Sequence, residues 1–378
     1  MRFLLAPDSF KGSLSAIEAC EIMEKSIGRL LPDALCVSMP LSDGGEGTVE
    51  IVAASLSHDV AYIEAEGPAG SPAGAPFIRV NDGAVLIECA STVGYTLVEG
   101  KRDPALYSSY GLGLMIRRLY EAGHRSIAVG LGGSATSDGG FGMAEALGYV
   151  FRDADGEQLS VKSGMPIPGL LSKVHEILPP EPYWIESLSC TALADVNNPL
   201  LGDSGAVRTY GPQKGIPAAD IDYWERAMEH AAGRVVDAFN GIDPNAPGMG
   251  SSGGLGFGLA AFCSARVQPG AAWIAGTAGF DEACTKSDAV LTGEGSIDSQ
   301  TFYGKVVDEV RRRAEQHGAQ VEAFGGIVEE AARQRYDAHK NIRLHCITPP
   351  GQPAAEAMSR ASENLSRAVE DVLRKYYL

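Results

Sequence analysis

The chain has 378 residues, of which 45% are hydrophobic and 21% are charged, and this composition is typical of a globular protein with about two domains. Its formal net charge of −17 argues against a general nucleic-acid-binding protein, and it means that an anionic substrate needs a local positive pocket or a metal ion. No apolar run approaches the roughly 20 residues that span a bilayer, and no signal peptide or cysteine framework is visible, so we expect a cytoplasmic protein without a membrane partner.

Strand and helix patterns alternate at the amino-terminal end. Ser15 and Glu18 are spaced as a capping box, which predicts where the first helix begins. Alternation of this kind favours parallel strands with right-handed crossovers. The expected elements are a strand at 2–6, a helix at 15–32, a strand at 34–41, a helix at 44–56 and a strand at 59–67.

The carboxy-terminal end repeats this alternation, and the middle of the chain does not. Residues 65–285 are rich in Gly and Pro, and their strands and helices alternate less regularly. We infer an α/β fold with a discontinuous parallel-sheet domain (1–64 and 286–378) and an inserted, glycine-rich mixed α/β domain (65–285), with two consecutive domains as the alternative. The elements expected at the carboxy end are a strand and loop at 287–295, a helix at 300–318, strands at 321–328 and 341–350, and one long helix over the last 25 or so residues.

Small and polar residues follow several strands of the predicted parallel sheet. Ligands of such sheets bind beyond the carboxyl ends of the strands, so these loops are the first place to look for a site. Each loop alone is more often an ordinary turn, but several on one edge are harder to dismiss. The residues in question are Asp8, Ser9 and Lys11 after the first strand, Asp43 and Glu46 after the second, and Glu294, Ser296 and Asp298 in the loop "TGEGSIDSQT".

The middle of the chain contributes two glycine loops, "GLGGSATSDGG" and "GMGSSGG", each before a helical pattern. Such loops present backbone N–H groups to anions, above all to phosphate. Both also match a dinucleotide fingerprint, and Asp153 follows the first at about the right distance, so an NAD(P)-dependent dehydrogenase that uses "GLGGSA" stays open. The hydroxyls in the first loop favour a phosphate site instead. A third segment, "DVNNPLLGDSGA" to "YGPQKG", carries Asp195 and Lys214.

Taken together, these segments resemble the glycerate kinase family of the bacterial glycerate 2-kinase type. The matching pieces are "APDSFKGSLSA", "PLSDGGEGTVE", "KRDP" with "SYGLG", "GLGGSATSDGGFGMAEALG", "DVNNPLLGDSGA", "YGPQKG", "GGLGFGLAAF" and "LTGEGSIDSQTFYGK". They occur in the family's order over at least residues 1–305. The first, the fourth and the last of these pieces are long and unusual, which makes the match specific.

The resemblance implies ATP-dependent phosphorylation of D-glycerate, with 2-phosphoglycerate favoured as the product. It also implies a flavodoxin-like discontinuous domain and an inserted domain, and we expect the active site in the cleft between them. The cofactors would be ATP and Mg²⁺, the partner a small molecule, and a homodimer is compatible with the sequence.

Roles for individual residues follow from the needs of phosphoryl transfer, which are positioning and neutralisation of charge. Lys11 and Asp8 are the candidates for offsetting charge and orienting the attacking hydroxyl; the alternatives are a surface lysine and a turn cap. Asp195 and Asp298 are our first choices for Mg²⁺, which usually takes only one or two carboxylates. For the nucleotide we choose Gly132, Gly133, Ser134, Thr136 and Ser137, then Gly253 and Gly254; for the substrate, Ser9, Asp43, Glu46, Glu294, Ser296 and Lys214.

Three departures from the family pattern matter. Ser296 stands where the family usually has arginine, "SYGLGLM" lacks a usual threonine and glutamate, and Ser251 and Ser252 replace two alanines. Loss of an anion-binding arginine puts the exact hydroxy acid in doubt, so a related sugar-acid kinase with a shifted substrate stays open. A non-catalytic sugar-acid or nucleotide sensor is the remaining alternative.

Overall fold

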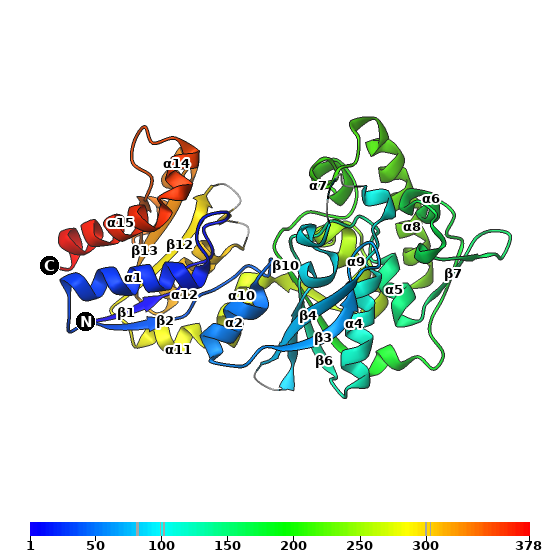
Figure 1. Ribbon diagram of the computed structural model, residues 1–378, viewed down its shortest axis with the longest axis horizontal. Coiled ribbons are helices and arrows are strands. Elements are labelled where there is room, and N and C mark those ends of the chain that lie inside the picture. Colours follow the sequence, from blue (N-terminus) through cyan, green and yellow to red (C-terminus); the bar gives the residue numbers. More distant parts are fainter. Residues whose placement is uncertain (81–82, 99, 101–102, 299–300, 303) are drawn as a thin grey trace. The chain divides into compact units, whose positions relative to one another are not determined.

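The computed structural model describes residues 1–80, 83–98, 100, 103–298, 301–302 and 304–378, and the chain divides into two compact units (Figure 1). The terminal unit comprises residues 1–43, 50–58 and 270–378, and the inserted unit comprises 44–49 and 59–269. Lys101 and Arg102 of the "KRDP" segment lie outside the described residues. Within the described residues, no helix is both long and apolar enough to cross a membrane.

The terminal unit is built on a five-stranded parallel sheet that takes strands from both ends of the chain. The strand order is β14-β13-β12-β1-β2, so β1 (Arg2–Leu5) lies between a strand from each end. Phe3 pairs with Ala289 on β12 and with Cys36 on β2, and all four pairings are parallel. The predicted parallel sheet from both chain ends, and with it the predicted fold class, is confirmed.

The core of this unit lies between the sheet and the helices α1 (Ala16–Leu30) and α15 (Ala361–Tyr376), which lie side by side in Figure 1. Phe3 and Leu5 from β1 pack with Met23 of α1 and Leu373 of α15, all fully or almost fully buried. Burial of such apolar side chains is the main favourable contribution to folding. The predicted capping box is present, with the Glu18 N–H donating to Ser15 Oγ and Glu18 accepting from the Ser15 N–H.

The remaining elements of the terminal unit follow in chain order. Helix α2 begins in the inserted unit and continues into the terminal unit. The elements are β2 (Leu35–Ser38), α2 (Thr48–Leu56), α10 (Gly270–Thr277), α11 (Phe280–Thr285), β12 (Ala289–Ile297), α12 (Val306–Gln316), β13 (Gln320–Val328), α13 (Glu330–Tyr336), β14 (Ile342–Cys346) and α14 (Ala354–Ser359).

The inserted unit contains a six-stranded mixed sheet of order β11-β10-β6-β5-β4-β3 and a small antiparallel sheet of order β8-β7-β9. Only the β3–β4 and β4–β5 pairings of the larger sheet are antiparallel. The unit's strands are β3 (Ala61–Glu66), β4 (Pro72–Arg79), β5 (Val85–Glu88), β6 (Ser126–Gly130), β7 (Val150–Arg152), β8 (Gln158–Leu159), β9 (Glu176–Leu178), β10 (Ser189–Ala194) and β11 (Arg266–Pro269).

Helices of the inserted unit pack with its sheets around one large core. Phe141, Phe151 and Phe262 meet in this core, with ring centroids 4.9 to 6.1 Å apart. The helices are α3 (Ala90–Val93), α4 (Tyr110–Glu121), α5 (Phe141–Leu147), α6 (Ile167–Leu171), α7 (Ala206–Lys214), α8 (Ile221–Ala238) and α9 (Ser251–Cys263).

Three expectations about individual elements are wrong. The strand expected at 59–67 does not continue the parallel sheet, because β3 pairs antiparallel with β4 in the inserted unit. Glu294 and Ser296 do not lie in a loop, because β12 continues to Ile297 in register with β13. The long carboxy-terminal helix is interrupted, because α14 ends at Ser359 and α15 starts at Ala361.

Candidate active site

The first candidate segment is the turn after β1, which the sheet holds through its backbone. The Asp8 N–H donates to the Gly293 carbonyl over 2.8 Å, and Phe10 and Leu14 form an antiparallel bridge that closes the turn. Phe10 is buried and anchors the turn in the core, whereas the Lys11 side chain is exposed. Lys11 precedes the N-cap Ser15, so it belongs to the turn and not to the first turn of α1.

Three carboxylates of the terminal unit, Asp8, Asp43 and Glu294, interact electrostatically, and we call them the carboxylate cluster. Burial and then the charge of Asp43 raise the pKa of Asp8 well above its ordinary value. The Ser9 N–H donates to Asp8 Oδ1 over 2.6 Å, which opposes this rise only in part. Like charges held together out of water resist ionisation, so the cluster favours a bound cation or a bound proton.

Glu294 has the best-defined surroundings of the three. It is 5% exposed and accepts a hydrogen bond of 2.9 Å from Thr301 Oγ1. Lys305 Nζ lies 3.9 Å from Glu294 Oε2. Burial raises the pKa of Glu294 to about 7, although Lys305 and Thr301 act against the rise. The carboxyl group can therefore hold or release a proton near neutral pH, which suits proton transfer or a hydrogen bond to a hydroxyl.

Two further residues chosen from the sequence lie near this cluster in the chain. Ser296 is half-buried on β12, opposite Ile327, and shares a strand face with Glu294 because side chains alternate along a strand. Asp298 follows β12, and its N–H donates to Thr301 Oγ1. Its charge contributes to the raised pKa of Glu294.

In the inserted unit, the first glycine loop follows β6 and lies against the segment Gly44–Glu46. A Cβ added to Gly130 would lie 2.6 Å from the Gly44 carbonyl oxygen, and one added to Gly132 would lie 2.7 Å from Gly45 Cα. The latter would also lie 3.3 Å from Asp195 Oδ2. Only glycine allows these backbone segments to approach so closely, and the approach brings Asp195 to the loop.

Lys214 is the central cation of this region. It is 3% exposed, and its Nζ donates to Ser134 Oγ over 2.9 Å and to the Thr136 carbonyl over 2.6 Å. Burial lowers the pKa of Lys214 to about 8, while Cys89, Asp138 and Asp195 act to raise it. An ammonium group in such a place is stabilised further by an anion, and it is then well suited to phosphate.

The second glycine loop completes the surroundings of Lys214. Ser252, Gly253 and Gly254 all have left-handed backbone angles, with φ of 53°, 72° and 92°. A Cβ on Gly253 would lie 2.0 Å from the Thr136 carbonyl oxygen and 2.8 Å from Lys214 Nζ. The two loops predicted as nucleotide sites therefore lie against each other, with Lys214 beside both.

Thr136 and Ser137 carry hydroxyl groups that are fully or almost fully buried and have no hydrogen-bond partner among the described residues. A buried polar group without a partner costs roughly 1–3 kcal/mol. Two free hydroxyls next to a buried ammonium group fit the oxygens of a phosphate chain. The chemistry of the donor set therefore suits a nucleotide phosphate, which is the cofactor expected from the sequence.

Asp138 belongs to the first glycine loop, but its side chain supports the loop from inside the protein. Its side chain is 1% exposed and turned inward, where Oδ2 accepts from Ser109 N, Ser109 Oγ and Gly142 N over 2.7 to 3.1 Å. Oδ1 accepts from Gly140 N over 3.1 Å. Burial still raises the pKa of Asp138 against the effect of these donors. Asp138 ties the loop to the starts of α4 and α5, and the sequence signalled this only through the "SYGLG" and "SDGG" motifs.

Mg²⁺ is the metal expected from the sequence. Among the described residues, no group of three or more His, Cys, Asp or Glu side chains is arranged to hold a metal ion. Mg²⁺ commonly takes one or two carboxylates and completes its shell with phosphate and water, so Asp195 beside the first loop fits such an ion. Asp195 belongs to the inserted unit and Asp298 to the terminal unit.

The chosen residues thus fall into two groups, each of which the structure describes within one unit. The roles of all the chosen residues stay predictions, those of Ser9, Glu46 and the Asp195–Asp298 pairing included. Sequence reasoning missed Thr301, Ser109 and Cys89; the last donates to the Gly132 carbonyl over 3.3 Å. The terminal unit holds Asp8, Ser9, Lys11, Asp43, Glu294, Ser296 and Asp298; the inserted unit holds Glu46, Gly132, Gly133, Ser134, Thr136, Ser137, Asp195, Lys214, Gly253 and Gly254.

The topology contradicts the dehydrogenase alternative. A dinucleotide fingerprint needs a strand, a helix and a second parallel strand of the same sheet. Here β6 and α5 are followed by β7, which belongs to the separate antiparallel sheet. Asp153 accepts from the Asp155 and Glu157 N–H groups in an exposed turn, so it is a turn residue and not a ribose ligand.

Comparison with known proteins assigns this arrangement of loops to a class of phosphotransferases. The family model described as "Glycerate kinase family" matches residues 3–377. The chain is 34% identical over 375 residues to a glycerate kinase of Halalkalibacterium halodurans, covering 98% of this chain and 96% of the relative. It is also 34% identical over 378 residues to the glycerate 2-kinase of Escherichia coli, covering 98% and 97%.

A solved structure agrees with these relatives. The crystal structure of a Salmonella typhimurium protein with the provisional name glycerate kinase 2 superimposes with a TM-score of 0.79 and 31% identity, covering 99% of this chain and 98% of that chain. The chain belongs to the glycerate kinase family, and the resemblance seen in the sequence is confirmed.

Proposed function

We propose that this protein transfers a phosphoryl group from ATP to D-glycerate, with 2-phosphoglycerate as the favoured product. The observation that carries the proposal is the match to the glycerate kinase family from residue 3 to residue 377, together with relatives named for this activity. The buried donors around Lys214 support it, since they suit a phosphate chain.

The inserted unit would bind the phosphate chain of ATP. Lys214, Thr136 and Ser137 offer an ammonium group and two hydroxyls without partners among the described residues. Glycine at 253 lets the Thr136 carbonyl and Lys214 lie against the second loop. Mg²⁺, with Asp195 as its first ligand and Asp298 as the second candidate, would supply charge neutralisation when bound. Fixed donors of this kind stabilise the charge that develops during transfer.

The terminal unit would handle the acceptor. Lys11 extends into solvent from the turn after β1, where it can pair with the glycerate carboxylate or with the transferring phosphoryl group. Asp8 would orient the attacking hydroxyl, and Glu294, with a pKa raised to about 7 by burial, would accept or share its proton. Ser9, Asp43, Glu46 and Ser296 remain candidates for contacts with the substrate hydroxyls.

Three sequence-based expectations stay predictions: the domain boundaries at 64/65 and 285/286, an active site to which both domains contribute, and a homodimer. Variants in both units test the second directly. If Lys11→Ala and Lys214→Met each lower turnover of the same reaction, then both units serve one site. Loss of turnover in only one of the two variants would contradict an active site to which both domains contribute.

The experiment that tests the function couples ADP release to NADH oxidation with purified protein, ATP, Mg²⁺ and D-glycerate. The expected results are turnover that stops in excess chelator and a product whose phosphorus and proton NMR spectra show phosphate on the 2-hydroxyl. L-Glycerate and longer sugar acids serve as matched alternative acceptors. Turnover of a longer acid in preference to D-glycerate would favour the related sugar-acid kinase, and saturable binding without turnover would favour the sensor.

A further inference from the structure

The terminal unit contains a cavity of about 670 Å³ along β14, the outermost strand of its sheet. The strand pairs only with β13, and the cavity extends from Leu344 on β14 to the segment Ile347–Pro350 that follows it. Its volume lies within the usual range for small-molecule sites. The loops proposed for catalysis follow β1, β2 and β12, whereas this cavity is lined by β14, the segment after it, α13 and α15.

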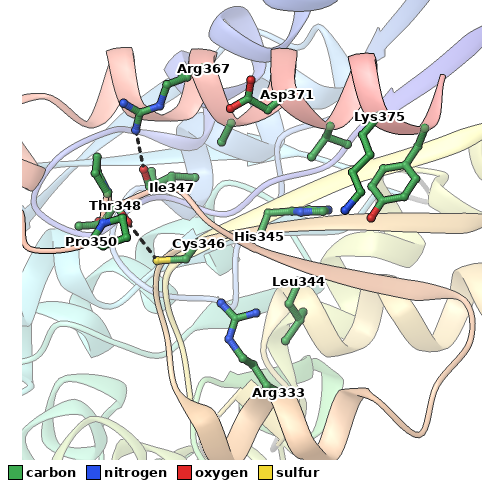
Figure 2. Close-up of a pocket in the computed structure, with 14 residues that line it drawn as sticks. Arg333, Leu344, His345, Cys346, Ile347, Thr348, Pro350, Arg367, Asp371 and Lys375 are labelled. Atoms are coloured by element: carbon green, nitrogen blue, oxygen red, sulfur yellow. Dashed lines mark hydrogen bonds between the residues drawn. The ribbon is translucent and has the colours of Figure 1, made fainter. Parts of the chain in front are cut away.

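Three cationic side chains line the cavity, and they come from two elements. Figure 2 shows Arg367 and Lys375 reaching from α15 on one side of His345 and Cys346, and Arg333 lying on the other side. Among the described residues, no carboxylate lies within ion-pair distance of any of the three, although most other arginines of α12–α15 have such a partner. Within the described part of the chain, Arg367 donates to the Ile347 carbonyl and to Asn364 Oδ1, over 3.4 and 3.3 Å.

The acids near the cavity do not neutralise these charges. Asp371 is the one carboxylate among the lining residues, and it forms an ion pair of 3.5 Å with Arg374. The buried Glu322 pairs with His345 over 2.7 Å and also with Arg343. The cavity therefore has an excess of positive charge in a chain whose formal net charge is −17, and the surplus charge is concentrated where a ligand has room to bind.

The spacing of the cations limits the shape of the ligand. Arg367 and Lys375 are eight residues apart on α15, which corresponds to about 12 Å along a helix axis. A single carboxylate or phosphate cannot reach both ends of that span, whereas a chain of linked phosphates can. The apolar wall formed by Leu344, Val372 and Tyr376 would accept an uncharged part of the same molecule.

We propose that this cavity is a binding site for an extended polyphosphate, either an inorganic chain or the phosphate chain of a nucleotide. Arg367 and Lys375 hold the two ends of the chain, and Arg333 closes on it from the opposite side. One guanidinium group can donate two parallel hydrogen bonds to phosphate oxygens, so the two arginines among the three cations suit a phosphate ligand.

Cys346 gives a local readout that does not depend on the kinase reaction. Its side chain is exposed and lines the cavity, whereas five of the other cysteines are buried and Cys36 is only half-buried. The experiment measures alkylation of Cys346 by mass spectrometry, with neutral iodoacetamide and anionic iodoacetate, at constant ionic strength and without Mg²⁺. Inorganic tripolyphosphate, ATP and monophosphate are titrated as protecting ligands.

We expect tripolyphosphate to protect Cys346 saturably and monophosphate to need at least tenfold higher concentration. The triple variant Arg333→Gln/Arg367→Gln/Lys375→Gln should lose the protection and slow alkylation by iodoacetate, with the iodoacetamide rate unchanged as a check on local folding. Arg335→Gln, on the same helix as Arg333 and stacked on Phe302, is the matched control and should behave as wild type.

The outcomes separate cleanly. Equal protection by tripolyphosphate and ATP supports a site for the phosphate chain alone, and tighter protection by ATP supports a nucleotide site that uses the apolar wall. Protection that is absent, that does not saturate, or that survives in the triple variant overturns the proposal. Equal protection by monophosphate overturns the extended shape of the ligand.

Discussion

The two units bury charges of opposite sign at their candidate sites. In the terminal unit, burial raises the pKa values of the carboxyl groups Asp8 and Glu294, whereas in the inserted unit it lowers the pKa of Lys214 to about 8. Both shifts have the same physical cause, because a charge out of water is costly unless it is paired. A ligand of the opposite charge would relieve each cost. This favours a cation or a protonated hydroxyl near Asp8 and Glu294, and an anion near Lys214.

The largest expected effect tests Lys11, an exposed cation in the turn after β1. Lys11→Ala should lower kcat about 10²- to 10³-fold, since removal of one comparable electrostatic group at other active sites has that effect. Its thermal stability should hold, because the side chain is exposed. Steady-state kinetics and a melting curve check both points.

Lys25→Ala is the matched control for this prediction. Lys25 is an exposed lysine on α1 whose partner is Glu21, so its loss should leave kcat unchanged. A Lys11→Ala enzyme with the kcat and kcat/KM of the wild type would show that Lys11 is only a surface residue. The contrast between an acceptor-handling unit and a phosphate-binding unit would then lose its main support.

The next prediction concerns the rigidity of the first glycine loop. Asp138→Ala removes the acceptor of hydrogen bonds from Ser109, Gly140 and Gly142, and should lower the free energy of unfolding by about 3 kcal/mol. Asp153→Ala removes an exposed acceptor of two N–H groups and should cost less than about 1 kcal/mol. Urea unfolding of both variants measures the difference, and equal losses would mean that Asp138 does not brace the loop.

Local patterns in the sequence predicted the parallel sheet well, because strand–helix alternation and the Ser15–Glu18 capping box depend on neighbouring residues. They failed where pairing between distant segments decides the outcome. Nothing in "DVAYIEAEG" shows that it pairs with Pro72–Arg79 in another sheet. Periodicity also cannot show that β12 continues through "GEGSI", since the partner strand β13 sustains it.

The candidate site shows the same limit. The sequence singled out Ser134 and Thr136 for the nucleotide and Lys214 for the substrate, and the structure brings Lys214, the last residue of α7, to both of the others. It did not reveal that Asp138 faces inward, because the direction of a side chain in a glycine loop depends on backbone angles that only the folded chain fixes. Ser252 is another such case, because the presence of a serine does not predict the positive φ that it adopts here.

A smaller effect, on pH dependence, sharpens the contrast between the two units. The pKa of Glu294 rises from 4.5 to about 7 on folding, so between these values the folded chain binds more protons than the unfolded chain. The free energy of unfolding should therefore fall as pH rises through this window, by on the order of 2 kcal/mol from this group. Lys214 acts in the opposite sense, because burial lowers its pKa from 10.5 to about 8 in the folded chain. Its contribution to the free energy of unfolding therefore rises with pH between these two values.

Glu294→Gln isolates the first of these effects. The variant mimics the protonated acid, so its stability relative to wild type should increase from near zero at about pH 4, below the pKa of the unfolded chain, to its full value above about pH 7.5. Urea unfolding at several pH values measures this difference, with Glu330→Gln, at the start of α13, as the control. A stability difference that does not change with pH would contradict the raised pKa.

The smallest expected effect comes from restoring a cation to the terminal unit at Ser296. The residue is half-buried on β12 and shares a strand face with Glu294, so an arginine there would extend alongside the carboxylate cluster. Ser296→Arg should lower KM for D-glycerate roughly fivefold, because a partly exposed ion pair with the substrate carboxylate adds on the order of 1 kcal/mol. It should change kcat less, since the pairing is the same in the ground state and the transition state. Ser296→Gln, of similar length without the charge, separates charge from size. If Ser296→Arg folds normally and loses activity, the site is built around serine, and the acceptor of this protein differs from the one that the family's arginine serves.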